Sequence, residues 1–170
     1  LLTALDTSDT CVTADQYPYT AGSSMMGAIL PPWAHAGGFE ATLARLGDPS
    51  ERARMKADLL AEGPHRWDNF WSWSGAAGIY VADLPSGRGT ERMGKSLAEL
   101  AGENDPIELA FDLLRDERMG VGMIAFSQDE RVVEALMAHP RVNGCTDGLL
   151  GGRPHPRAYG AFAKFLRLNR

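Results

Sequence analysis

The amino-acid sequence predicts an α/β fold, chiefly from the order of the elements in its last third. From residue 120 onward come a buried run GVGMIAF, a capped helical segment, a short run RVNGCT, a Gly/Pro-rich loop and an amphipathic helix. Strands that alternate with helices in this way form parallel sheets. In such sheets, functional residues lie beyond the carboxyl ends of the strands. We therefore expect the site in the loops that follow strands.

The first part of the chain contains one expected strand and two expected helices. CVTADQYPYT alternates in polarity and predicts a strand that ends at Pro18. Residues 21–38 are rich in Gly, Ser and Pro and predict a loop. Helices are expected over 38–46 and 49–62, the second because Asp48 precedes a proline at the first helical position.

The middle of the chain adds aromatic residues and helix caps. WDNFWSWSG predicts a local core or interface, and GIYVADL predicts a strand. Capping-box spacing begins at Ser96, at Asp105 and at Ser127. The helix after Asp105 should run to about residue 117, and the one after Ser127 should end at His139. The last helix is expected over 158–168.

Composition excludes several classes of partner. The chain has 170 residues, a net charge of -5 and a pI of about 5.3, so neither nucleic acid nor an anionic membrane is an expected partner. No apolar run approaches the roughly 20 residues that span a bilayer, and no targeting signal is visible, so we expect a cytoplasmic protein. Cys11 and Cys145 are expected to be small buried residues. The start at Leu1, without Met, leaves two alternatives open, a truncated piece or a natural short product.

Two loops carry the candidate chemistry: DQYPYTAGSS and TDGLLGGRPHPRAYG. The second places Asp147, Arg153, His155 and Arg157 within a short stretch. Taken singly, each has a plain alternative: an Asp-Gly turn, solvated arginines, or a histidine that only holds its loop. The four histidines of the chain lack the spacing of a metal cage. The question that stays open is whether the two loops share one site.

Five stretches together carry a family resemblance: DQYPYTAGSS, ILPPWAHAGG, GKSLAELA, HPRVNGCTDG and GGRPHPRAYG. In this order they resemble the C-terminal part of the D-aminoacylases, which are the N-acyl-D-amino-acid deacylases of the amidohydrolase superfamily. The match runs over residues 12–159. It implies a (β/α)8 barrel with zinc at the carboxyl ends of its strands, which hydrolyses the amide of an N-acyl-D-amino acid.

The resemblance also implies roles for individual residues. Asp147 matches the catalytic acid that takes a proton from the metal-bound water, and Arg157 matches the arginine that grips the substrate carboxylate. Tyr17 matches a tyrosine that assists this arginine, and Ser23 matches a residue of the substrate pocket. Thr146 stands where the family usually has Ser. The remaining loop residues are assigned to positioning the loop, and they are Arg153, His155 and Tyr159.

The implied organisation is a partial (β/α)8 amidohydrolase-type barrel, with only the last strands and helices, and an inserted α+β lid. Residues 1–32 give a barrel strand and the substrate loop, 33–102 the lid, and 103–170 the last βα units. A complete barrel needs about 250 residues. The family's other zinc ligands match nothing in this chain, so Asp147 would contact zinc only if the missing ligands were supplied.

Three hypotheses follow. The chain is the clamp and proton-shuttle portion of a zinc-dependent D-aminoacylase, incomplete for catalysis alone, or it is a non-catalytic carboxylate-binding relic or module. A cyclic-amide hydrolase of the same superfamily is the weaker alternative. The expected ligand is a small N-acyl-D-amino acid. Uncovered strand edges predict self-association or docking with a missing barrel half.

We predict that the isolated chain retains no stoichiometric zinc, because its histidines and cysteines lack ligand spacing. The measurement is metal analysis after dialysis against a mild chelator. Zinc that stays bound at one equivalent per chain would contradict this prediction.

Overall fold

The computed structural model describes residues 12–150 and 152–168, so Cys11 and the start at Leu1 lie outside the described part. The elements follow in this order: β1 (Ala14–Gln16), β2 (Ala21–Met25), the 3-10 helices η1 (Met26–Ile29) and η2 (Pro32–His35), α2 (Phe39–Gly47), α3 (Pro49–Leu60), α4 (Phe70–Gly78), β3 (Ile79–Asp83), η3 (Thr90–Arg92), α5 (Leu97–Ala101), α6 (Pro106–Asp116), β4 (Gly122–Phe126), α7 (Glu130–Met137), β5 (Val142–Gly144) and α8 (Arg157–Leu168).

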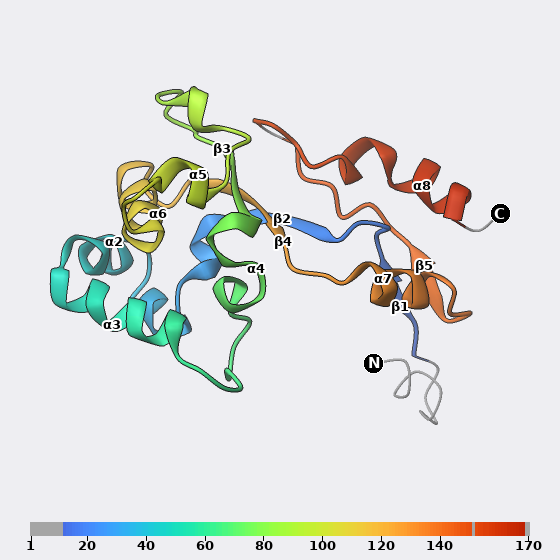
Figure 1. Cartoon of the computed structure of the whole chain (residues 1–170), viewed down its shortest axis with the longest axis horizontal. Helices are drawn as coiled ribbons and strands as arrows, with labels where there is room; N and C mark the ends of the chain where they lie inside the picture. The colour runs from blue at the N-terminus through green and yellow to red at the C-terminus, as the bar shows by residue number, and fades with distance from the viewer. Residues whose placement is uncertain (1–11, 151, 169–170) are drawn as a thin grey trace.

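The strands form two separate sheets. β1 and β5 pair in parallel, with Ala14 opposite Val142. β4 is the central strand of an antiparallel sheet, between β2 and β3. Figure 1 shows the helices α2 to α6 gathered at one end of the molecule and β1, β5 and α7 at the other, with β2 and β4 running between them.

The prediction of one parallel sheet after residue 120 holds for β5 and is wrong for β4. β4 runs antiparallel to both of its neighbours. Met123 and Ala125 are buried, whereas Ile124 is half-buried and Phe126 is 51% exposed. This alternation of burial is typical of an antiparallel sheet with one face on the core. The sequence does not reveal it, because the residues on both faces of this strand are apolar. No closed barrel forms within the described residues, which make a mixed α/β fold.

The segment 21–38, predicted as a loop, contains β2 and two 3-10 helices. β2 has the sequence AGSSM, whose Gly and Ser have low strand propensity. Its strand conformation comes from pairing with β4, in which Ala21 lies opposite Phe126. Pairing between segments distant in the chain is invisible to a local sequence pattern.

The predicted helix starts are confirmed at three of four caps. Asp48 accepts from Ser50 N and Glu51 N at the start of α3. Ser96 forms a reciprocal capping box at α5, and Asp105 caps α6. α7 is capped by Asp129, not by the predicted Ser127. Both Ser127 and Asp129 are residue types that cap helices, and the Asp129 carboxylate is the one that accepts the backbone N–H of Arg131.

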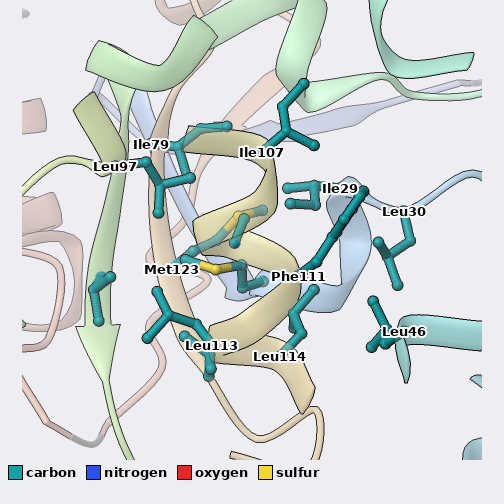
Figure 2. Packing of buried hydrophobic residues seen from close by; sticks show 14 of the residues in the cluster. Ile29, Leu30, Leu46, Ile79, Leu97, Ile107, Phe111, Leu113, Leu114 and Met123 are labelled. Atoms are coloured by element: carbon teal, nitrogen blue, oxygen red, sulfur yellow. The ribbon is translucent and has the colours of Figure 1, made fainter. Parts of the chain in front are cut away.

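The core is built around α6. Phe111 is fully buried, and Figure 2 shows it among Ile29, Leu46 and Met123, which come from three other elements. The WDNFWSWSG stretch, interpreted as local core or interface, leads into α4 and forms its first part, and its Trp71 packs against this cluster. The apolar interior therefore holds the antiparallel sheet against the helices.

One face of α8 is left open. Tyr159, Phe162 and Leu166 are exposed by 75%, 59% and 65%, and their spacing places them on one side of the helix. Self-association of the chain, expected from its uncovered edges, stays a prediction.

Phe111→Ala should lower the free energy of unfolding by about 3–5 kcal/mol, because the substitution leaves a cavity that a close-packed core does not refill. Urea unfolding followed by circular dichroism measures the loss. Phe162→Ala, at an exposed phenylalanine of α8, is the control and should change stability by less than about 0.5 kcal/mol. Equal effects of the two substitutions would contradict the placement of the core.

Candidate functional site

The two candidate loops leave neighbouring strands at the same edge. Tyr17 follows β1, and Asp147 lies shortly after β5. The strands are parallel, with Gln16 opposite Gly144, and the Cys145 N–H donates to the Gln16 carbonyl at 3.1 Å. Because parallel strands end on the same side, both loops begin next to each other. The structure thus brings together the two stretches that the sequence analysis singled out.

Arg157 joins the two loops. Its side chain is 2% exposed, although it lies in the first turn of α8. Nη2 donates to the Ser23 carbonyl at 3.0 Å and forms an ion pair with Asp147 Oδ2, also at 3.0 Å. The guanidinium lies over the Tyr17 ring, 4.4 Å from its centroid, at the distance of a cation–π contact. Four residues assigned to one site by sequence are therefore in contact.

The placement of Arg157 is unfavourable for stability alone. A cation in the first turn of a helix opposes the helix dipole. Within the described residues, its Nε atom is buried without a hydrogen-bond partner, and an unsatisfied buried donor costs about 1–3 kcal/mol. Local rules are broken in this way mostly at functional sites. The guanidinium therefore has donor capacity left for a ligand that carries acceptors.

Backbone geometry presents Asp147 to this arginine. Asp147 has a φ of 43°, a left-handed conformation that Asp tolerates better than most residues. A Cβ on Gly148 would lie 2.7 Å from the Cα of Ala158, so glycine is required for the loop to approach the start of α8. The Asp147 carboxylate is 66% exposed in spite of its ion pair. It is thus held beside Arg157 and accessible to a substrate.

His155 supports the backbone of Arg157. Its ring is buried, and its Nδ1 accepts the Arg157 N–H at 3.0 Å, which places the proton of the neutral ring on Nε2. The ring of Tyr19 meets it edge to face, with centroids 5.2 Å apart. Burial lowers the pKa of His155, and the charges of Arg157 and Lys164 lower it further. The neutral imidazole is therefore the form that fits this position.

Gln128 is a site residue that the sequence analysis missed. Its Nε2 donates to the Tyr17 hydroxyl at 3.0 Å, and its Oε1 accepts from Gln16 Nε2 at 3.1 Å. These bonds hold the tyrosine ring beneath Arg157. Gln128 follows the carboxyl end of β4, so the strand-end rule pointed at it, but the sequence interpretation used it only as part of a helix cap.

A cavity of about 330 Å³ opens beside Asp147 and Arg157. Its apolar wall includes Phe70 and Trp73 of α4, whose rings meet edge to face at 5.3 Å, and Met123 of β4. The volume lies in the range of small-molecule sites. α4 belongs to the segment 33–102, and its aromatic rings form one side of this cavity.

The other predicted site residues are placed as follows. Ser23 lines the cavity, and its backbone carbonyl, not its hydroxyl, contacts Arg157. Arg153 donates its backbone N–H to the Ala82 carbonyl at 2.9 Å, and its side chain faces a different cavity. Tyr159 is 75% exposed on α8. The roles that the resemblance gives to these residues stay predictions.

The residues present do not fit a zinc site. In the part of the chain that the structure describes, no group of three or more His, Cys, Asp and Glu side chains could hold a metal ion. Asp147 is a single donor already paired with Arg157. Cys145 is partly exposed, contrary to the expectation of full burial, and desolvation together with the charges of Asp15 and Asp147 raises the pKa of its thiol. A protonated thiol is a poor zinc ligand.

No helix among the described residues is long and apolar enough to cross a membrane. No protein-family model matches the chain, and no curated protein is similar to it in sequence. Comparison with solved structures gives a different result.

The chain is similar in structure to D-aminoacylase. Two D-aminoacylase structures match with a TM-score of 0.57, at 22% and 21% identity, over 98% of this chain and 27% of theirs. The first comes from work on the role of a binuclear metal centre, and the second defines a novel subset of amidohydrolases. N-acyl-D-glutamate deacylase from Bordetella bronchiseptica, complexed with zinc and a phosphonate inhibitor, matches with a TM-score of 0.50 at 23% identity. That match covers 92% of this chain and 25% of the deacylase.

The predicted resemblance is thereby confirmed at the level of the fold. The chain spans about a quarter of the length of these D-aminoacylase-like structures. At sequence identities below 25%, the similarity shows a shared fold and does not show a shared activity.

The free energy of unfolding should depend on pH through the protonation of His155. Because its pKa is lowered in the fold, the unfolded chain takes up a proton first as the pH falls. The stabilisation is complete above the ordinary histidine pKa of about 6.5 and is lost as the pH falls from there through the lower pKa of the fold. Urea unfolding over this range should show stability decreasing with acid. His155→Asn, which keeps an acceptor near Nδ1 but does not titrate, should flatten the decrease.

The control is His35→Asn, at an exposed histidine far from this loop in sequence. It should leave the decrease as steep as in the unsubstituted chain. If His155→Asn and the control behave alike, His155 is not the titrating group.

Proposed function

We propose that this chain is the substrate-clamp and proton-accepting portion of a D-aminoacylase-like hydrolase, which cleaves the amide of N-acyl-D-amino acids. The observation that carries the proposal is the buried Arg157, with an unpaired Nε donor, beside an accessible Asp147 at the edge of a small-molecule cavity. The similarity in fold to D-aminoacylase supports it.

In this proposal β1 and β5 are the last two strands of a (β/α)8 barrel. Their parallel pairing and the loops at their carboxyl ends are in keeping with barrel enzymes, which place their sites at that face. The segment 33–102 acts as the lid, because the aromatic rings of α4 wall the cavity. The remaining strands would be supplied by a longer product or a second chain.

Arg157 binds the substrate carboxylate. A guanidinium meets a carboxylate with two parallel hydrogen bonds, and Arg157 has its Nε donor free for such a pair. Tyr17 and the Ser23 carbonyl hold the guanidinium plane in place. The substrate carboxylate would take the place of the Asp147 carboxylate at Nη2.

Asp147 acts as a general base and then as a general acid. Amide hydrolysis needs a group that removes a proton from the attacking water and delivers it to the leaving amine. Asp147 is exposed to the cavity and held by a strained backbone that fixes its direction. Phe70 and Trp73 would contact the apolar part of the substrate.

Zinc is the cofactor that the resemblance to D-aminoacylases implies, and the Bordetella deacylase is complexed with it. The described residues provide too few ligands, so its holders would have to come from the supplied strands. Catalysis by this chain alone is therefore not part of the proposal. A binding module without catalysis is the alternative, and it uses the same arginine cradle.

N-acetyl-D-phenylalanine should bind the chain about tenfold more tightly than its C-terminal amide, because only the acid pairs with Arg157. Calorimetry or NMR titration measures both. Arg157→Lys keeps the positive charge but loses the two parallel N–H donors of the guanidinium. The preference for the acid over the amide should therefore fall below about threefold. Arg66→Lys, at an exposed arginine outside the cavity, is the control and should leave it unchanged. Equal binding of acid and amide to the unsubstituted chain would refute the clamp.

Asp147→Asn separates binding from catalysis. The substitution removes the internal partner of Arg157, so the acid ligand should bind about twofold to fivefold more tightly. In an assembly that hydrolyses the ligand, the same substitution should lower kcat by roughly 10²-fold or more without raising KM. An unchanged kcat in that assembly would exclude Asp147 as the base.

A further inference from the structure

A second cavity lies on the opposite face of the antiparallel sheet. Side chains of a strand alternate between its two faces. Met123 and Ala125 of β4 line the cavity of the candidate site, whereas Ile124 and Phe126 line another cavity of about 390 Å³. This second cavity lies between the sheet and the loop that ends in α8. It is not part of the proposed substrate site.

The walls of the second cavity are mainly apolar. Tyr19, Tyr80, Ile124 and Phe126 contribute to them, and the rings of Tyr80 and Phe126 meet edge to face with centroids 5.6 Å apart. A pocket of this volume with mostly apolar walls and few polar groups is the usual form of a small-molecule site. The polar groups then decide which ligand it takes.

Besides the hydroxyl-bearing Tyr19, Thr20 and Tyr80, the cavity is lined by two residues with nitrogen donors in their side chains, His155 and Arg153. His155 is 4% exposed, and its Nδ1 is occupied by the Arg157 N–H, so its Nε2–H is the donor left over. Nε2 makes no hydrogen bond to any of the described residues. Its ring is thus a buried, fixed donor at the cavity wall.

Arg153 supplies the charge. Its backbone N–H is anchored on Ala82, and its side chain lies flat over Gly94, where a Cβ would come within 2.7 Å of Nη1. Across residues 12–150 and 152–168, its guanidinium has no carboxylate partner, whereas Arg157 and Arg52 are both ion-paired. An arginine held over an apolar cavity without an acid attracts an anion.

We propose that this second cavity binds a small monocarboxylate with an aryl or alkyl body. The carboxylate pairs with the Arg153 guanidinium and accepts from His155 Nε2, and the apolar body lies against Tyr80, Ile124 and Phe126. The proposal does not depend on the proposed hydrolase activity, because it uses a different arginine and the other face of the sheet.

The probe is 4-phenylbutyrate, with 4-phenylbutyramide as its uncharged counterpart. Calorimetry gives the dissociation constants. In a chain with labelled Ile and Met methyl groups, intermolecular NOEs give the face, because Ile124 and Met123 line opposite cavities. We expect NOEs from the phenyl protons to Ile124 and none to Met123. The amide should bind about tenfold more weakly.

Variants test the polar contacts. Arg153→Gln should raise the dissociation constant of 4-phenylbutyrate about tenfold, and this residue is exposed, so the fold should persist. Arg66→Gln makes the same charge change at an exposed site outside the cavity and should have no effect. Ile124→Trp should block binding by filling the cavity. Trp73→Ala, in the wall of the candidate substrate site, should leave binding unchanged.

The proposal is overturned by three results. One is NOEs to Met123 together with weaker binding in Trp73→Ala, which would place the probe in the candidate substrate site. Another is the absence of any contribution from the charge pair with Arg153, seen either as equal affinity for acid and amide or as no effect of Arg153→Gln. The third is the absence of saturable binding in the millimolar range. None of these results bears on the N-acetyl-D-phenylalanine experiment, whose ligand pairs with Arg157.

Discussion

The site depends on the contacts that the buried guanidinium of Arg157 makes with both loops. It holds the first loop through Tyr17 and the Ser23 carbonyl, and the second through Asp147. A charge taken out of water is tolerated only with partners around it, so these contacts are coupled to one another. His155, which accepts the backbone N–H of the same residue, adds the start of α8 to the assembly.

The antiparallel sheet gives the molecule its second organising feature. β4 lies at its centre and is paired on both sides, so its position is fixed by two sets of backbone hydrogen bonds. One face covers the core around Phe111 (Figure 2). The same face borders the candidate site. The other face borders the cavity with Arg153. Arg153 in the loop and Arg157 in the first turn of α8 therefore line two separate cavities.

The similar solved structures are much longer than this chain. The chain spans about a quarter of the D-aminoacylase structures that it resembles. Within that quarter, the parallel pair β1–β5 is short (Figure 1). The open face of α8 carries the exposed residues Tyr159, Phe162 and Leu166. In the proposed function, Arg157 as the clamp and Asp147 as the base would form one side of an amide-hydrolysing centre, and the metal ligands would come from outside the described residues.

The sequence by itself determined the local features. Helix starts at Asp48, Ser96 and Asp105 were readable because a cap depends on residues a few positions apart. The stretches that carry Tyr17, Asp147 and Arg157 were readable because their motifs are long and irregular. Tertiary structure alone decided that β4 is antiparallel and that AGSSM is a strand, because both depend on pairing between segments about 100 residues apart. It also decided that Gln128 supports Tyr17 and that Arg153 and Arg157 line different cavities, since these placements depend on contacts between segments that are far apart in the sequence.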